Sequence, residues 1–219
     1  MLSIKDLFSL EHTLAADYLE GFTWPWEALS GLGGEIKRLI GLLPQGEYEA
    51  YSDDVLIHRT ARISPLATIT GPCIIGPETE VRPGAFIRGK ALVGAGCVVG
   101  NSVELKNCIL FDSVQVPHYN YVGDSILGYH AHMGAGAVTS NIKADQKNVV
   151  VHDGTEAYNT GLRKMGAMLG DGADIGCNTV LNPGTIIGRY ARVYPLSCVR
   201  GTVPEKHIYK TGGTIVPIK

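Results

Sequence analysis

The chain has 219 residues, which is enough for one domain with a small addition, and 19 Lys and Arg residues nearly balance 21 Asp and Glu residues. The formal net charge of -2 argues against a general nucleic-acid-binding protein, which usually carries a basic excess. No apolar run approaches the roughly 20 residues of a membrane span. We therefore expect neither a nucleic-acid partner nor a membrane partner.

The N-terminus and the cysteines favour a cytoplasmic protein. The first residues, MLSIKDLFSLEH, carry an acidic residue early and lack the basic-then-apolar pattern of a signal peptide. The five cysteines are an odd number without a CxxC pair, which is typical of a reduced compartment.

Residues 1–50 predict a short helical segment. Apolar residues from Leu14 to Leu19 follow helical spacing, and a second apolar-striped helix is expected over residues 35–43. We interpret this segment as a helical cap over the first coil of the repeat that follows, because a solenoid must cover its terminal edge.

A six-residue repeat runs through residues 51–203. Counting by six from Ile57, an apolar residue recurs at every step to Phe111, and the same spacing returns from Leu169 to Val199. Neither helical nor alternating periodicity produces this spacing, whereas a hexapeptide repeat does. Each hexad supplies one large core residue and one small corner residue. The pattern predicts an all-β solenoid, a parallel β-helix whose three-sided coils stack about 4.8 Å apart.

The repeat is interrupted in two places. Its phase is off between Phe111 and Leu127, and it is lost over residues 140–168. We expect the second stretch to be a loop that leaves the solenoid, and loops of this length in compact domains are usually functional. Residues 204–219 are expected to form a C-terminal tail.

Four short motifs break the monotony of the repeat. They read RPGA, VELK, HYNYVGD and GAGAVTSN, and they begin at Arg82, Val103, His118 and Gly134. In order and spacing they resemble the acetyltransferase domain of the bifunctional N-acetylglucosamine-1-phosphate uridyltransferase/glucosamine-1-phosphate N-acetyltransferase family. The resemblance implies a left-handed β-helix that forms a homotrimer, uses acetyl-CoA as co-substrate, requires no metal and acetylates an amino-sugar phosphate.

The resemblance also implies roles for individual residues. His118 would be the general base that deprotonates the acceptor ammonium, and Glu104 would orient its imidazole. Asn141 would position the amino group, and the backbone at Ala135 would contact acetyl-CoA. The acceptor would be bound by Arg82, Lys106, Tyr121, His132 and Lys147.

Part of the family pattern is missing. No nucleotide-binding domain precedes the repeat, so no uridyltransferase activity is expected. The residues after Asn141 depart from the family, which leaves the acceptor sugar open. Glu104, Tyr121 and Asn141 are each about one coil apart, and we expect them to line one face of the solenoid.

Two other functions stay open at this point. A γ-carbonic-anhydrase-like enzyme would bind Zn²⁺ through three imidazoles, which His118, His130 and His132 supply in number. A non-catalytic sugar-nucleotide-binding β-helix protein would need no base. Acetyl transfer to an amino-sugar phosphate is the leading hypothesis. The cysteines fall in core or turn positions rather than beside His118, so we expect direct attack without a covalent acyl-enzyme.

Overall fold

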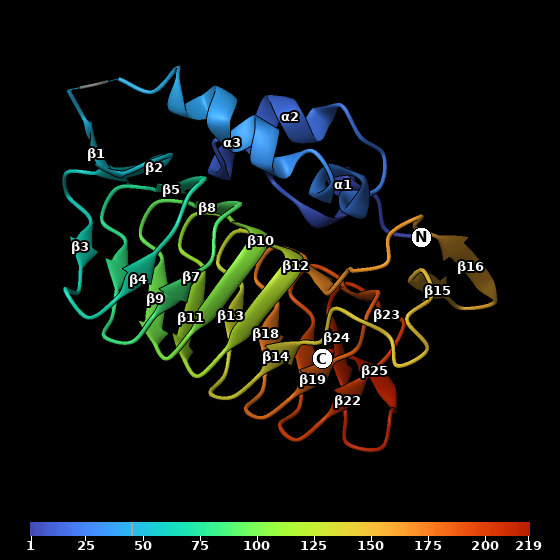
Figure 1. Cartoon of the computed structure of the whole chain (residues 1–219). Coiled ribbons are helices and arrows are strands. Elements are labelled where there is room, and N and C mark those ends of the chain that lie inside the picture. Colours follow the sequence, from blue (N-terminus) through green and yellow to red (C-terminus); the bar gives the residue numbers. More distant parts are fainter. Residues whose placement is uncertain (45) are drawn as a thin grey trace.

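The computed structural model describes residues 1–44 and 46–219, and it places a group of short helices beside a long stack of strands (Figure 1). None of the helices in these two ranges is long and apolar enough to cross a membrane. The helical elements are α1 (Ile4–Leu7), η1 (Leu10–His12), α2 (Ala16–Glu20), η2 (Pro25–Leu29) and α3 (Leu32–Ile40).

The strands form a three-sided parallel β-helix. The first face holds β2 (Val55–His58), β5 (Cys73–Ile75), β8 (Ala91–Val93), β17 (Ala167–Leu169), β20 (Thr185–Ile187) and β23 (Thr202–Val203). The second face holds β3 (Arg62–Ile63), β6 (Glu80–Val81), β9 (Val98–Asn101), β11 (Gln115–His118), β13 (His132–Met133), β18 (Asp174–Ile175), β21 (Arg192–Val193) and β24 (His207–Tyr209). The third face holds β4 (Thr68–Ile69), β7 (Phe86–Ile87), β14 (Val138–Thr139), β19 (Val180–Leu181) and β22 (Cys198–Val199).

Two long strands connect the third face to the first. β10 (Glu104–Leu110) and β12 (Tyr121–Leu127) pair in parallel along their length. Asn107 and Asp124, near the middle of each strand, both have a φ of 49°. This left-handed backbone bends each strand around the corner without a separate turn.

The shortened corner explains the first interruption of the repeat. Leu110 pairs with Val93 and Leu127, so Leu110 and not Phe111 continues the row of core residues. Phe111 is also buried, but it packs against Phe8 of the helical segment, with ring centroids 5.1 Å apart. The prediction that Phe111 fills the solenoid core is therefore wrong.

An antiparallel strand covers each end of the solenoid. β1 (Tyr48–Ser52) pairs with β2, and β25 (Ile215–Pro217) pairs with β24. Such covering strands protect backbone groups that would otherwise form an exposed sheet edge. Because β24 lies on the second face, the solenoid continues past residue 203 into the expected tail.

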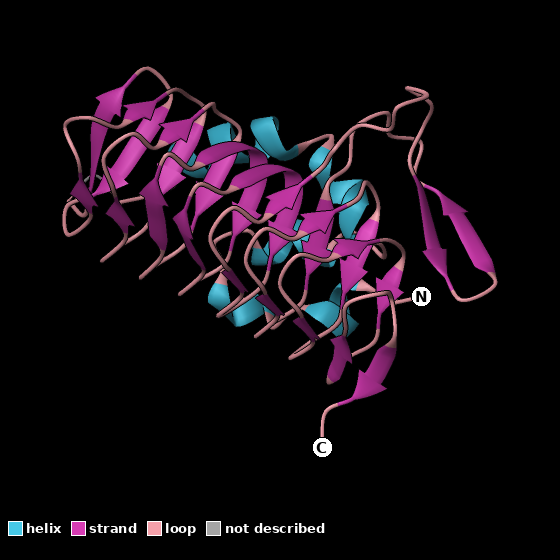
Figure 2. Cartoon of the chain, turned by 90° about the horizontal axis from the view of Figure 1, so that it is seen from below, coloured by secondary structure: helices cyan, strands magenta, loops and turns pink. Residues whose placement is uncertain are grey.

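The helical segment, residues 1–44, lies along the first face, and we call it the strap (Figures 1 and 2). α3 contacts β5, β8 and β10, whereas η2 contacts β12. The backbone carbonyls of Leu7 and His12 accept hydrogen bonds of 3.0 Å from Asp171 and Asp112. The prediction that the helices cap the first coil is therefore wrong. β1 closes that edge, and the apolar side of the helices covers the first face instead.

Between β14 and β17 the chain leaves the solenoid as an insert, residues 140–166. Its two strands, β15 (Val150–Asp153) and β16 (Glu156–Asn159), form an antiparallel hairpin that projects to one side (Figure 2). The insert leaves and rejoins at the corner that β10 and β12 cross, because Gly166 N donates to Asp124 O at 2.8 Å. Residues far apart in sequence therefore meet at this corner.

Candidate active site

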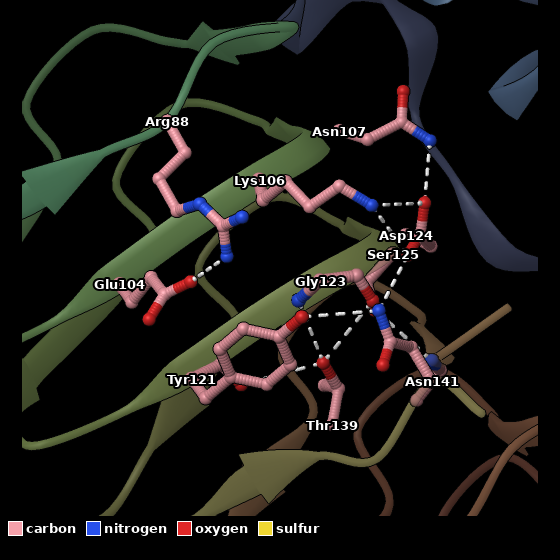
Figure 3. Close-up of polar contacts among 11 residues, drawn as sticks. Arg88, Glu104, Lys106, Asn107, Tyr121, Gly123, Asp124, Ser125, Thr139 and Asn141 are labelled. Carbon is pink, nitrogen blue, oxygen red and sulfur yellow. Dashed lines mark hydrogen bonds and ion pairs between the residues drawn. The ribbon is translucent and has the colours of Figure 1, made fainter. Parts of the chain in front are cut away.

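A buried carboxylate lies at the corner where β12 bends. Asp124 is only 4% exposed, and it accepts hydrogen bonds from Asn107 Nδ2 at 2.8 Å and from Asn141 Nδ2 at 2.5 Å. Lys106 Nζ lies 3.3 Å from Asp124 Oδ2 and forms an ion pair with it (Figure 3). Parallel stacking explains the cluster, because Asn107, Asp124 and Asn141 hold equivalent positions in successive coils.

Tyr121 joins this cluster from the third face. Asn141 Nδ2 donates a hydrogen bond of 3.0 Å to the phenol oxygen. Burial, followed by the negative charges of Asp124 and Glu104, raises the pKa of Tyr121 above its usual range. The phenol therefore stays protonated near neutral pH and can donate to a ligand. We call the five residues Lys106, Asn107, Tyr121, Asp124 and Asn141 the Asp124 cluster.

A second ion pair lies beside the Asp124 cluster. Arg88 Nη1 is 2.5 Å from Glu104 Oε1, and this hydrogen bond raises the pKa of the Arg88 guanidinium (Figure 3). The pairing of Phe86 with Glu104 places Arg88 level with Lys106 on the next coil. The structure thus joins Glu104 to Arg88, and a role of Glu104 in orienting His118 stays a prediction.

His118 lies at the opposite edge of the third face, where β11 ends. Its side chain is exposed, and Nδ1 is 3.2 Å from Asn101 Oδ1. When Nδ1 donates to this oxygen, the lone pair of the ring is on Nε2, which is the form that a general base requires. His118 and Asp124 therefore lie at the two edges of the third face, and Tyr121 lies between them.

Ala135 belongs to the same edge as His118, one coil further on. The neighbouring Gly136 N donates a hydrogen bond of 3.0 Å to His118 O, and Ala135 O accepts one of 2.8 Å from Asn178 N. The backbone near Asn101, His118, Ala135 and Asn178 is therefore stacked from coil to coil along one edge of the solenoid. A cofactor lying along this edge would meet backbone groups and the imidazole together.

The other predicted residues lie apart from the Asp124 cluster. Arg82 is at the His118 edge and pairs with Glu80 at 3.1 Å. His132 is on the second face, and its hydrogen bond of 2.8 Å to Asp174 lowers the pKa of that carboxyl group. Lys147 is exposed on the insert. Of the predicted acceptor residues, the structure brings together Lys106 and Tyr121, with Asn141.

Three residues of this region were not among the predicted site residues. Asp124 stands at the end of the HYNYVGD motif, and its burial among polar donors was not visible in the repeat. For Asn107 and Arg88, the sequence offers only their spacing as a sign of a role in the site. Each stands one coil before a residue of the cluster, Asn107 before Asp124 and Arg88 before Lys106, so a correct coil count identifies both.

The histidines of the zinc hypothesis have separate neighbours. His118 contacts Asn101, His130 packs beside the ring of Tyr129 with centroids 4.1 Å apart, and His132 contacts Asp174. Across residues 1–44 and 46–219, no group of three His, Cys, Asp or Glu side chains is arranged to hold a metal ion. The described residues therefore provide no set of zinc ligands for the carbonic-anhydrase-like hypothesis.

Residues 69–210, which are more than half of the chain, match the family described as the GMPPB C-terminal domain. The chain belongs to this family. The chain is 34% identical over 135 residues to a bifunctional sugar-1-phosphate nucleotidylyltransferase/acetyltransferase of Sulfurisphaera tokodaii, a match that covers 62% of the chain and 32% of the relative. It is 31% identical over 200 residues to the bifunctional protein GlmU of Methanococcus maripaludis, covering 89% of the chain and 48% of the relative. These relatives confirm the resemblance drawn from the four motifs.

The chain spans about a third to a half of the length of these curated relatives. Among solved structures it is similar to the acetyltransferase domain of PglB from Neisseria gonorrhoeae in complex with acetyl coenzyme A. That likeness has a TM-score of 0.36 and 17% identity, and it covers 85% of this chain and 67% of the other.

Proposed function

We propose that the protein transfers the acetyl group of acetyl-CoA to the amine of an amino-sugar phosphate. The observation that carries the proposal is the Asp124 cluster, which gathers Lys106, Tyr121 and Asn141 at one corner. These are three of the side chains to which the resemblance assigns the acceptor. Hydrogen-bond donors and acceptors in fixed directions are what a sugar with an amine and hydroxyl groups requires.

The reaction needs a base and no covalent intermediate. The acceptor ammonium gives a proton to His118 Nε2, and the free amine then attacks the thioester carbonyl. His118 releases that first proton to solvent. As the C–N bond forms and the C–S bond breaks, His118 takes the second proton from the attacking nitrogen and passes it to the leaving thiolate of coenzyme A, so the reaction releases one proton overall. Burial raises the pKa of the Cys73 and Cys97 thiols to about 12, so neither is a nucleophile near neutral pH.

We further propose a homotrimer in which the active site lies between subunits. Within one chain, His118 and Asp124 lie at opposite edges of the third face. Packing of third faces around a threefold axis would bring the His118 edge of one subunit toward the cluster of its neighbour. The same arrangement would cover the exposed Phe86 and Val180 side chains of that face.

A thiol-release assay tests the proposed activity. Wild-type protein is given acetyl-CoA and a panel of amino-sugar phosphates, with glucosamine 1-phosphate first and galactosamine 1-phosphate second. His118→Ala is expected to lose roughly 10²–10⁴-fold in turnover, the usual contribution of a positioned base, while acetyl-CoA binding is retained. His130→Ala, another exposed histidine on a turn, is the matched control and should turn over normally.

Two results would overturn parts of this proposal. Wild-type turnover by His118→Ala would show that the base is another group. If the wild-type protein released no thiol with any amino sugar, a non-catalytic sugar-binding protein would be the better explanation. UDP-sugar formation from UTP is not expected.

A further inference from the structure

A pocket of about 510 Å³ opens beside the Asp124 cluster, between the strap and the insert. Leu29 lines it from the strap, Arg163 and Lys164 line it from the insert, and Asn107 and Asp124 line it from the solenoid. This volume is within the range of small-molecule sites. The pocket is therefore large enough for a sugar phosphate, and it is continuous with the cluster that the proposed function assigns to the acceptor.

The pocket carries an excess of positive charge. Lys90, Arg163 and Lys164 line it and are exposed. Within the described part of the chain, none of these three cations has a carboxylate partner within 4.0 Å. The one carboxylate lining the pocket, Asp124, is already engaged by Lys106 and two amides. An anionic ligand would balance this charge.

The two cations in and beside the Asp124 cluster, unlike those of the pocket, already have carboxylate partners. Lys106 is paired with Asp124, and Arg88 is paired with Glu104. A phosphate that bound to Lys106 or Arg88 would compete with a carboxylate already in place. A phosphate in the pocket would meet cations without such a competitor, so charge complementarity favours the pocket.

Asn107 adds a polar group that points to a ligand. Its Nδ2 donates to Asp124 Oδ1, which fixes the amide with Oδ1 turned away from that carboxylate (Figure 3). Asn107 Oδ1 is buried, and it has no hydrogen-bond partner among the described residues. Buried acceptors in proteins are nearly always satisfied. Because Asn107 lines the pocket, a small shift of its side chain would let a hydroxyl or ammonium group of a ligand satisfy this one.

We propose that this pocket is the phosphate subsite of the acceptor, where Lys90, Arg163 and Lys164 bind the phosphoryl oxygens and Asn107 Oδ1 accepts a hydrogen bond from the sugar. The inference rests on the proposed function for the identity of the sugar phosphate. It assigns the phosphate to Arg163 and Lys164 of the insert and to Lys90 of the solenoid rather than to Arg82 or Lys106. Because the insert departs from the family pattern, it would set the acceptor preference of this chain.

Calorimetric titration tests the subsite without relying on turnover. Glucosamine 1-phosphate, glucosamine and inorganic phosphate are titrated into wild-type protein, Lys90→Ala/Lys164→Ala and Lys210→Ala. Lys210 is an exposed lysine after β24 and serves as the control. The double variant should bind glucosamine 1-phosphate at least about tenfold more weakly, with glucosamine unaffected, because charge-assisted bonds to the phosphate are lost. Lys90→Arg/Lys164→Arg should restore the affinity.

The outcomes separate this inference from the proposed function. If the double variant binds glucosamine 1-phosphate as tightly as wild type and keeps its KM, the subsite assignment is wrong even when acetyl transfer is observed. If binding of the sugar phosphate depends on the two lysines but no thiol is released, the subsite stands and the proposed activity fails.

Discussion

Replacing Asp124 by asparagine removes one negative charge from the corner with little change in side-chain size. Asp124 accepts hydrogen bonds from Asn107 and Asn141 and pairs with Lys106, whose side chain is 26% exposed. Asparagine offers a single acceptor oxygen, so at least one amide donor and the ammonium of Lys106 lose their partner. A lost hydrogen bond to a charged group costs about 1.5–3 kcal/mol, so we expect the free energy of unfolding to fall by about 2–4 kcal/mol.

Urea denaturation measures this loss, with wild type and variants at one protein concentration because assembly shifts apparent stability. Asp145→Asn is the matched control. Its partner Lys143 lies 3.3 Å away on the insert, where solvent screens the ion pair, so its loss should change the free energy of unfolding little. A fall below about 0.5 kcal/mol for Asp124→Asn would refute the argument that this carboxylate holds the corner together. Acetyl transfer by the same variant should also decrease, because Lys106 and Asn141 lose their fixed orientation.

Three further measurements follow from the structure. Light scattering should give a homotrimer of about 70 kDa from the 23.4 kDa chain, and a monomer at micromolar concentration would contradict the site between subunits. Arg88→Ala should raise the KM for the acceptor by about 3- to 10-fold, because Arg88 holds Glu104 beside the Asp124 cluster. Arg82→Ala should raise this KM less, because Arg82 pairs with Glu80. Equal effects of the two variants would contradict this reasoning. The hydrogen bond from His132 lowers the pKa of Asp174 in the folded state, so its contribution to stability is present above the unfolded pKa and is lost as pH falls through the folded value. Urea midpoints of wild type and Asp174→Asn should therefore differ near neutral pH and converge in acid, and a constant difference would contradict the linkage.

Much of the fold follows from the six-residue spacing. The repeat predicts coils with inward aliphatic residues, and Ile75, Val93, Leu110 and Leu127 do lie in one buried row. It cannot predict that β10 and β12 cross a corner with one residue fewer, since that depends on left-handed backbone at Asn107 and Asp124. The spacing also leaves the hand of the coil open, and the left hand comes from the resemblance.

The candidate site was only partly predictable for a related reason. Coil periodicity brings Glu104 and Tyr121 into register, and Asn141 reaches Tyr121 through its side chain. The motif match selected Arg82, whose role stays a prediction, but it carries no signal for Arg88, which stacking places beside Glu104. The path of the insert has no periodicity at all, and its contribution to the pocket could come only from the structure.

The strap has a consequence for how the solenoid unfolds. In a solenoid each coil contacts only its neighbours, so coils can open one after another from either end. Here α3 packs on β5 and β8, whereas Ser9 N donates a hydrogen bond of 2.8 Å to Asp171 many coils later. One segment thus ties early coils to late ones and couples their opening. Amide exchange should therefore report a single cooperative unit in place of gradual fraying from the ends.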